Sequence, residues 1–216
     1  MSILKINYRS GSVVDKKSWH NEIDFHCSFG IWPFKKSLDI TPAGFLYCGE
    51  LFPLKTITRL RWGVDQRRGG PFPKVRYLAT FGSETREFTI KTRQKDFYEH
   101  LTQRFWRAVG KRLMAELLDG LRKGKTFQFG DFSVSDEGIT VTQKGLFKGS
   151  QSKFYDWKQL KWGIVNGNLV FTPSEATDRL LTSASFLWVD NTHILSVALA
   201  LLQERPDKKL LSAIAG

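Results

Sequence analysis

The sequence predicts a mainly β protein of the α+β class, in which one unit of strands and a helix occurs twice. Apolar and polar residues alternate along most of the chain, and this period of two is typical of strands with one buried face. The stretch RLRWGV at 59–64 returns as QLKWGI at 159–164, and an apolar stretch of helical length follows each set of predicted strands. A chain of 216 residues is long enough for two domains of about 100 residues each.

The predicted strands follow the same order in both halves. The first half shows a strand, a turn and a strand within 37–52, then strands at 56–64, 74–81 and 86–92. The corresponding segments of the second half are 131–143, 153–164, 168–173 and 180–189. Gly44 and Gly138 occupy matching turns, where we expect positive φ. The offset is 94 residues at these turns and 100 at the Trp-Gly pairs, which an insertion of six residues within 144–152 explains.

A helix is expected after each set of strands. The first is predicted over 94–122, with an apolar stripe formed by Leu101, Phe105, Val109, Leu113, Leu117 and Leu121. Asn191 can cap the second helix, which reaches Gln203 and is apolar on nearly all sides.

These elements divide the chain into three segments. We predict an N-terminal extension at 1–30 that packs on the first domain, a first domain at 31–124 and a second at 125–216. Alternation within the extension suggests strands that complete the first domain or cover a sheet edge, with a partner-docking arm as the alternative.

A meander of short hairpins followed by one amphipathic helix resembles the pleckstrin-homology (PH) superfold. The stretches LDITPAGFLYCGELFPLKTITRLRWG and FSVSDEGITVTQKGLFKGSQSKFYDWKQLKWG look like PH-like domains of bacterial proteins. The resemblance covers most of the chain and implies two PH-like β-barrels in tandem, each closed by a C-terminal helix. Trp106 lies in the first helix, where PH domains often have a core Trp. A single mixed α+β sheet is the alternative.

The positive charge is concentrated in the first half. The net charge is +12, and residues 1–125 hold 24 Lys and Arg against 12 Asp and Glu, whereas residues 126–216 hold nine of each. This asymmetry favours an anionic partner for the first domain.

Two groups of basic residues are candidates for binding an anionic ligand or a partner. The resemblance places the phosphoinositide motif of PH domains at the first hairpin turn, but the turns at 41–44 and 135–138 are neutral and acidic, so we do not expect that site. Guanidinium groups beside an aromatic ring suit phosphate or carboxylate, and cations near Trp106 suit a nucleic-acid backbone. Ordinary solvated surface is the alternative for both groups. The candidates are Arg67, Arg68, Phe72, Lys74 and Arg76 in a hairpin loop, and Arg104, Arg107, Lys111 and Arg112 on the first helix.

Known enzyme motifs and metal-ligand spacings are missing from the sequence. We therefore expect no enzyme, no cofactor and no metal, and Cys27 and Cys48 are expected to be unpaired thiols. The N-terminal residues lack a signal-peptide pattern, and no apolar run reaches the roughly 20 residues of a membrane span. A cytoplasmic location is expected, with peripheral membrane association as an option.

The functional hypothesis is a non-enzymatic interaction or adaptor module that binds another protein through PH-like domain surfaces. The alternative is peripheral binding of an anionic phospholipid membrane, or less favourably of nucleic acid, through the basic first domain.

Overall fold

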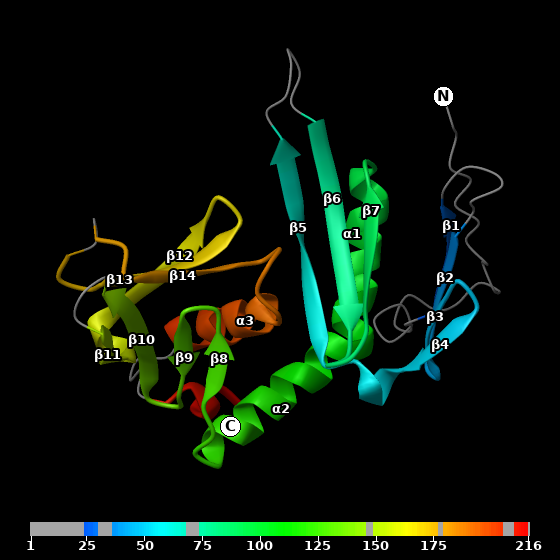
Figure 1. Ribbon diagram of the computed structural model, residues 1–216. Helices are drawn as coiled ribbons and strands as arrows, with labels where there is room; N and C mark the ends of the chain where they lie inside the picture. The colour runs from blue at the N-terminus through cyan, green and yellow to red at the C-terminus, as the bar shows by residue number, and fades with distance from the viewer. Residues whose placement is uncertain are drawn as a thin grey trace.

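The structure is a computed structural model that describes residues 24–29, 36–67, 74–145, 149–176, 179–204 and 210–215. The prediction of a mainly β chain is confirmed (Figure 1). The first half forms a sheet of β1 (Phe25–Phe29), β2 (Lys36–Thr41), β3 (Gly44–Tyr47) and β4 (Glu50–Pro53), and a sheet of β5 (Arg59–Arg67), β6 (Lys74–Gly82) and β7 (Glu87–Thr92). The second half forms a sheet of β8 (Phe127–Phe129), β9 (Phe132–Val134), β10 (Gly138–Gly145) and β11 (Gly149–Asp156), and a sheet of β12 (Leu160–Val165), β13 (Asn168–Pro173) and β14 (Thr182–Ser185).

The prediction of two closed PH-like barrels is wrong. The strands form four separate antiparallel sheets, and each edge strand pairs with one neighbour only among the described residues. The 3-10 turns η2 (Leu54–Thr56) and η4 (Trp157–Gln159) lie between the four-stranded and the three-stranded sheet of each half and end the pairing there. The single mixed sheet is not formed either. The order of four strands, a 3-10 turn, three strands and a helix is nevertheless the same in both halves.

The predicted strand at 153–164 is interrupted by η4 because Asp156 caps that turn. Its carboxylate accepts hydrogen bonds from the amides of Lys158 and Gln159, and the side chain of Gln159 bonds back to the Asp156 amide. This reciprocal arrangement satisfies the backbone groups locally, so the chain turns instead of extending.

Gly44 and Gly138 are required by close packing between strands. A Cβ atom on Gly44 would lie 2.2 Å from the carbonyl oxygen of Phe52, and one on Gly138 would lie 2.0 Å from that of Tyr155. Positive φ was expected at both positions, but Gly138 does not adopt it. The neighbouring strand, which approaches closely at the same place in each half, is therefore the shared reason for glycine.

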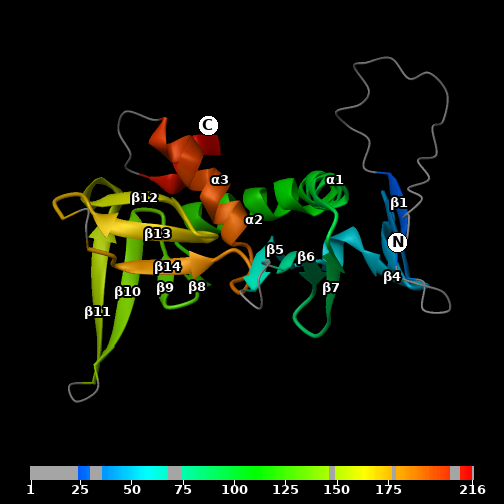
Figure 2. The ribbon, with the colours of Figure 1, turned by 90° about the horizontal axis from the view of Figure 1, so that it is seen from above.

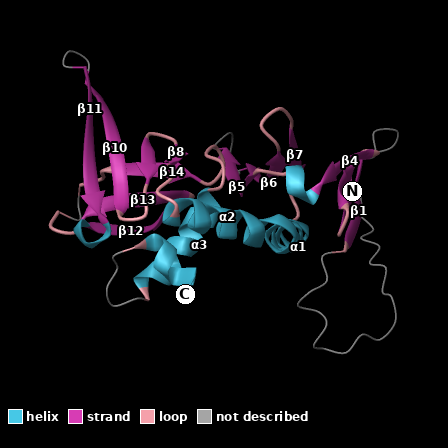
Figure 3. Cartoon of the chain, turned by 90° about the horizontal axis from the view of Figure 1, so that it is seen from below, coloured by secondary structure: helices cyan, strands magenta, loops and turns pink. Residues whose placement is uncertain are grey.

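One long helix serves both halves of the molecule. It runs through α1 (Lys95–Phe105), the π turn η3 (Trp106–Gly110) and α2 (Lys111–Arg122), so the predicted helix does not close the first half alone. Its α1 part contacts β6 and β7, whereas α2 contacts α3 (Thr192–Gln203) and the C-terminal turn η5 (Leu211–Ala215). Figure 3 shows α1, α2 and α3 lying between the four-stranded sheets at the two ends of the molecule.

The spacing of the apolar stripe explains why this helix faces two directions. Buried apolar residues occur at every fourth position from Phe97 to Leu121, with Leu118 as one further buried residue. A turn takes about 3.6 residues, so each step of four rotates the stripe by about 40°. The π turn has more residues per turn than the α-helix, so it reverses part of this rotation. Gly110 allows that turn, because a Cβ there would lie 2.6 Å from the Trp106 ring.

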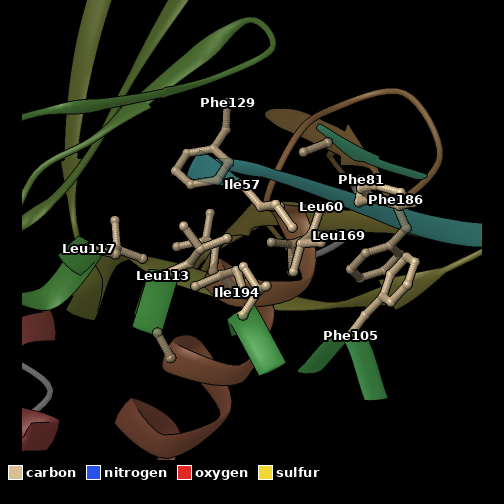
Figure 4. Packing of buried hydrophobic residues seen from close by; sticks show 14 of the residues in the cluster. Ile57, Leu60, Phe81, Phe105, Leu113, Leu117, Phe129, Leu169, Phe186 and Ile194 are labelled. Atoms are coloured by element: carbon tan, nitrogen blue, oxygen red, sulfur yellow. The ribbon is translucent and has the colours of Figure 1, made fainter. Parts of the chain in front are cut away.

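The buried apolar residues form one cluster that includes both halves. In the first half, Phe45 stacks on Phe105 at 5.0 Å and contacts the edge of Phe81 at 4.9 Å. Figure 4 shows residues of the first half, such as Leu60 and Leu113, packed close to Leu169 and Ile194 of the second. The domain boundaries predicted at residues 30 and 124 stay a prediction.

The turn at 135–138 fixes the C-terminal segment. The carboxylate of Asp136 accepts hydrogen bonds from the Ser212 amide and hydroxyl, each at 2.7 Å. Its backbone carbonyl accepts hydrogen bonds from the indole N–H of buried Trp157 at 2.7 Å and from the amide of Leu211 at 2.8 Å. The acidic residue in this turn therefore has a structural role.

Asp136→Ala is expected to lower the free energy of unfolding by about 2 kcal/mol, because two hydrogen bonds to a charged acceptor are lost. Urea denaturation measures the change. The neighbouring exposed Glu137 provides the control. Equal stability of Asp136→Ala and Glu137→Ala would contradict the structural role of the Asp136 carboxylate.

Candidate protein-docking surface

The two halves meet where the connection between β14 and α3 crosses the edge of β5 (Figure 2). Asn191 pairs with this edge as a strand residue would. Its amide donates to the Leu60 carbonyl at 2.9 Å, and its side-chain oxygen accepts from the Leu60 amide at 3.0 Å. Its side-chain amide also donates to the Thr58 carbonyl at 2.8 Å. Asn191 adopts φ of 59°, in the left-handed region that asparagine tolerates well.

The predicted capping role of Asn191 is therefore wrong in one respect. The residue occupies the N-cap position of α3, but its side chain makes no bond to the helix. The side chain instead bonds to the backbone of Leu60 and Thr58, more than 130 positions away in the sequence.

His193 is held between two aromatic rings, one from each half. Its imidazole stacks on Trp62 with ring centroids 4.1 Å apart and on Phe186 at 4.3 Å. The Nε2–H group donates to the backbone carbonyl of Trp62 at 2.6 Å. Burial lowers the pKa of His193 from 6.5 to about 4, although the bond to the carbonyl favours the charged form. The imidazole is therefore neutral near pH 7.

A charged cluster covers the outer side of the same junction. Asp190 approaches Arg59 at 3.5 Å and Arg61 at 3.4 Å, and Arg61 also pairs with Glu87. Burial raises the pKa of Asp190, and the two arginines partly oppose this rise. The cluster thus joins β5 and β7 to the residue that precedes Asn191.

Four exposed apolar residues lie on the strands and the connection that meet near this junction, and we call them the junction surface: Val64, Ile164, Val165 and Trp188. Their exposed fractions are 41%, 65%, 52% and 70%. The amide of Phe186 bonds to the Gly167 carbonyl at 3.1 Å, which brings Trp188 near the end of the β12–β13 hairpin. A Cβ on Gly63 would lie 2.9 Å from Leu187, so the connection also passes next to Val64. Val64 and Ile164 are the last residues of the two repeated stretches.

The hairpin candidates lie at the far end of β5 and β6. Arg67 and Lys74 are directly opposite each other in the strand register. The side chains of Arg67, Arg68, Phe72 and Lys74 lie outside the described residues. Arg76 is half-buried across from Asp65.

The helix candidates are on the other side of the β5–β7 sheet. Tyr77 packs on Tyr98 of α1 with centroids 5.0 Å apart, so alternation along β6 points Arg76 away from the helix. The Arg112 guanidinium donates to the carbonyls of Leu54 and Ile57 and pairs with Glu116. Arg104 and Arg107 are half-buried and have interaction partners, and Lys111 is exposed. The structure therefore does not bring Arg76 together with the helix cations.

Sequence reasoning missed the junction surface and the residues that support it. Asn191 and His193 contact β5 residues that are 131 positions away in the sequence, and a local sequence pattern cannot predict such contacts. One signal was present: both repeated stretches end in a β-branched residue after Trp-Gly, and both of these residues are exposed.

Comparison with family models, curated proteins and solved structures finds no match to this chain. Within the described part of the chain, no group of three or more His, Cys, Asp or Glu side chains is arranged to hold a metal ion. No helix there has the length and apolar character needed to cross a membrane. Cys27 is buried, Cys48 is exposed, and both are free thiols.

The stability of the protein is expected to fall as the pH is lowered from 7 to 5. His193 in the unfolded chain takes up a proton near pH 6.5, whereas the folded protein resists protonation down to about pH 4. The loss amounts to about 2 kcal/mol at pH 5. The raised pKa of Asp190 has the opposite sign, because protonation of its buried carboxylate relieves a cost of folding as the pH falls.

Urea denaturation of His193→Phe tests this expectation, because phenylalanine keeps the ring stack but cannot titrate. The variant should lose most of the pH dependence, whereas His100→Gln, on the exposed side of α1, should keep it. The same pH dependence in His193→Phe and wild type would contradict the assignment.

Proposed function

We propose that this protein is a non-enzymatic interaction module of the cytoplasm that binds an extended segment of another protein at the junction surface. The observation that carries the proposal is the open edge of β5 next to exposed Trp188. β5 pairs with β6 on one side. On the other side, among the described residues, Asn191 bonds to Leu60 and His193 bonds to Trp62, and the strand continues past these contacts to Val64 and Gln66.

The open edge has the geometry for strand addition. Leu60 directs both of its backbone groups toward Asn191, so alternation directs those of Val64 and Gln66 to the same side. A peptide backbone can bond to these groups, while its apolar side chains pack on exposed residues nearby. Trp and Tyr residues often supply much of the binding energy of such contacts, and Trp188 is the most exposed large apolar residue described.

The charges nearby favour a partner segment that also contains acidic residues. The end of the β5–β6 hairpin contains Arg67, Arg68, Lys74 and Arg76 in sequence. Carboxylates on a strand added to β5 would lie near this basic end, which favours association and orients the peptide.

The alternative function is binding of an anionic membrane or of nucleic acid through the basic first half. The charge asymmetry supports it. The helix cations support it less, because Arg112 is engaged with two carbonyls and Glu116. We therefore place protein binding first.

Selection from a random-peptide display library against the immobilised chain tests the proposal. The enriched peptides should alternate apolar residues and contain acidic ones. Trp188→Ser should weaken their binding by at least about tenfold in fluorescence anisotropy. Val64→Pro should do the same, because proline removes an edge N–H without breaking the ladder to β6.

Leu201→Ser is the matched control, since Leu201 is an exposed apolar residue on α3 outside the junction surface. Its affinity for the peptides should equal that of the wild type. Enriched peptides that bind all three variants equally would refute the docking site. Retention on phosphatidylserine vesicles or nucleic acid at low salt, with no peptide enriched, would establish the alternative instead.

A further inference from the structure

The strand registers define equivalent positions in the two four-stranded sheets. Gly44 pairs with Pro53 in the first half, and Gly138 pairs with Asp156 in the second. Counting back from these partners, Phe52 corresponds to Tyr155, and Glu50 corresponds to Lys153.

In the first half, the residue at the second of these positions, Glu50, forms an ion pair. Glu50 of β4 pairs with Arg86, which precedes β7 in the neighbouring sheet. The same guanidinium lies over the Phe52 ring, 5.5 Å from its centroid. One carboxylate and one cation thus bridge the two sheets and neutralise each other.

In the second half, a cation, Lys153, replaces the acidic Glu50, and a second cation, Arg179, lies beside the same pocket. The amine of Lys153 lies over the Tyr155 ring, 4.8 Å from its centroid, as Arg86 does over Phe52. Arg179, which precedes β14, takes the place of Arg86 in the chain order. Lys153 and Arg179 line an open pocket of about 440 Å³ together with Gln151, Ser152 and Tyr155. These five residues include no carboxylate.

The pocket lies where the core-side face of β11 reaches solvent, because Lys153 and Arg179 are both exposed. Lys153 is opposite buried Val141, and Tyr155 is opposite buried Ile139, so both point to the core side of the sheet. An amine on that side, with a second cation across from it, lowers its electrostatic energy by acquiring a negative partner. The molecule supplies such a partner to Arg86 but not, among the lining residues, to Arg179.

We propose that this pocket binds a phosphate group, which takes the place that the Glu50 carboxylate has in the first half. Besides the two cations, Gln151, Ser152 and Tyr155 line the pocket, and alternation along β11 places Gln151 and Tyr155 on the same face as Lys153. The ammonium, the guanidinium, the Tyr155 hydroxyl and the Gln151 amide together offer more donors than the two oxygens of a carboxylate accept, and they suit the oxygens of a phosphate. This site is independent of the proposed peptide docking.

Calorimetric titration of the full chain with pyrophosphate and with inorganic phosphate, at matched ionic strength in sodium chloride, tests the site. Lys153→Glu recreates the acid–arginine pair of the first half with Arg179. It should weaken binding by at least about tenfold while leaving the Tm equal to or above that of the wild type. Lys158→Glu makes the same change of charge at an exposed lysine outside the pocket and should retain the wild-type affinity.

Sedimentation with phosphatidylcholine vesicles, with and without phosphatidic acid, identifies the source of the phosphate. Binding to the phosphatidic acid vesicles alone indicates a lipid headgroup, and binding of soluble pyrophosphate alone indicates a free phosphate compound. Either result supports the site if Lys153→Glu abolishes the binding and Lys158→Glu does not. A wild type that binds no phosphate probe, or two variants that weaken binding equally, would overturn the proposal.

Discussion

The fold depends on how the open edge of β5 is satisfied. A strand edge exposes N–H and C=O groups that need partners, and no described strand of the first half pairs with this edge. Asn191 of the second half bonds to Leu60 and Thr58, and His193 bonds to Trp62. These contacts position α3 against α2, and the apolar cluster then continues from one half into the other.

The two halves keep the same order of elements but use equivalent positions differently. Trp62 stacks on His193, whereas Trp162 contacts Trp157 edge-on at 5.9 Å. A Cβ on Gly63 would lie 2.9 Å from Leu187, whereas one on Gly163 would meet no atom of the described residues within 4 Å beyond its chain neighbours. Glu50 and Lys153 differ in charge at one register position. The first two differences arise where one copy contacts the other, whereas the third lies within each half.

Local patterns predicted much of the fold. Alternation located most of the described strands, and the four-residue apolar spacing located the long helix. The barrels were wrong because alternation shows which face of a strand is buried but not which edges pair. The break at Cys48–Gly49, where both residues adopt positive φ, also escaped the pattern, since cysteine gives no turn signal.

The candidate site was harder to predict than the fold. An apolar residue in the sequence does not show whether it is buried or exposed, so the exposure of Trp188 and Ile164 could not be predicted. The basic residues were conspicuous, yet Arg112 proved to bond to backbone carbonyls inside the fold. Lys153 and Arg179 line one pocket although they are 26 residues apart, which composition does not reveal.

Native-state hydrogen exchange of Asn191→Ala tests the central claim most directly. If Asn191 joins the halves into one cooperative unit, the variant loses protection equally at buried amides of β6 and β13, by about 1 to 3 kcal/mol. A loss confined to β13, with the amides of β6 as protected as in the wild type, would contradict this account.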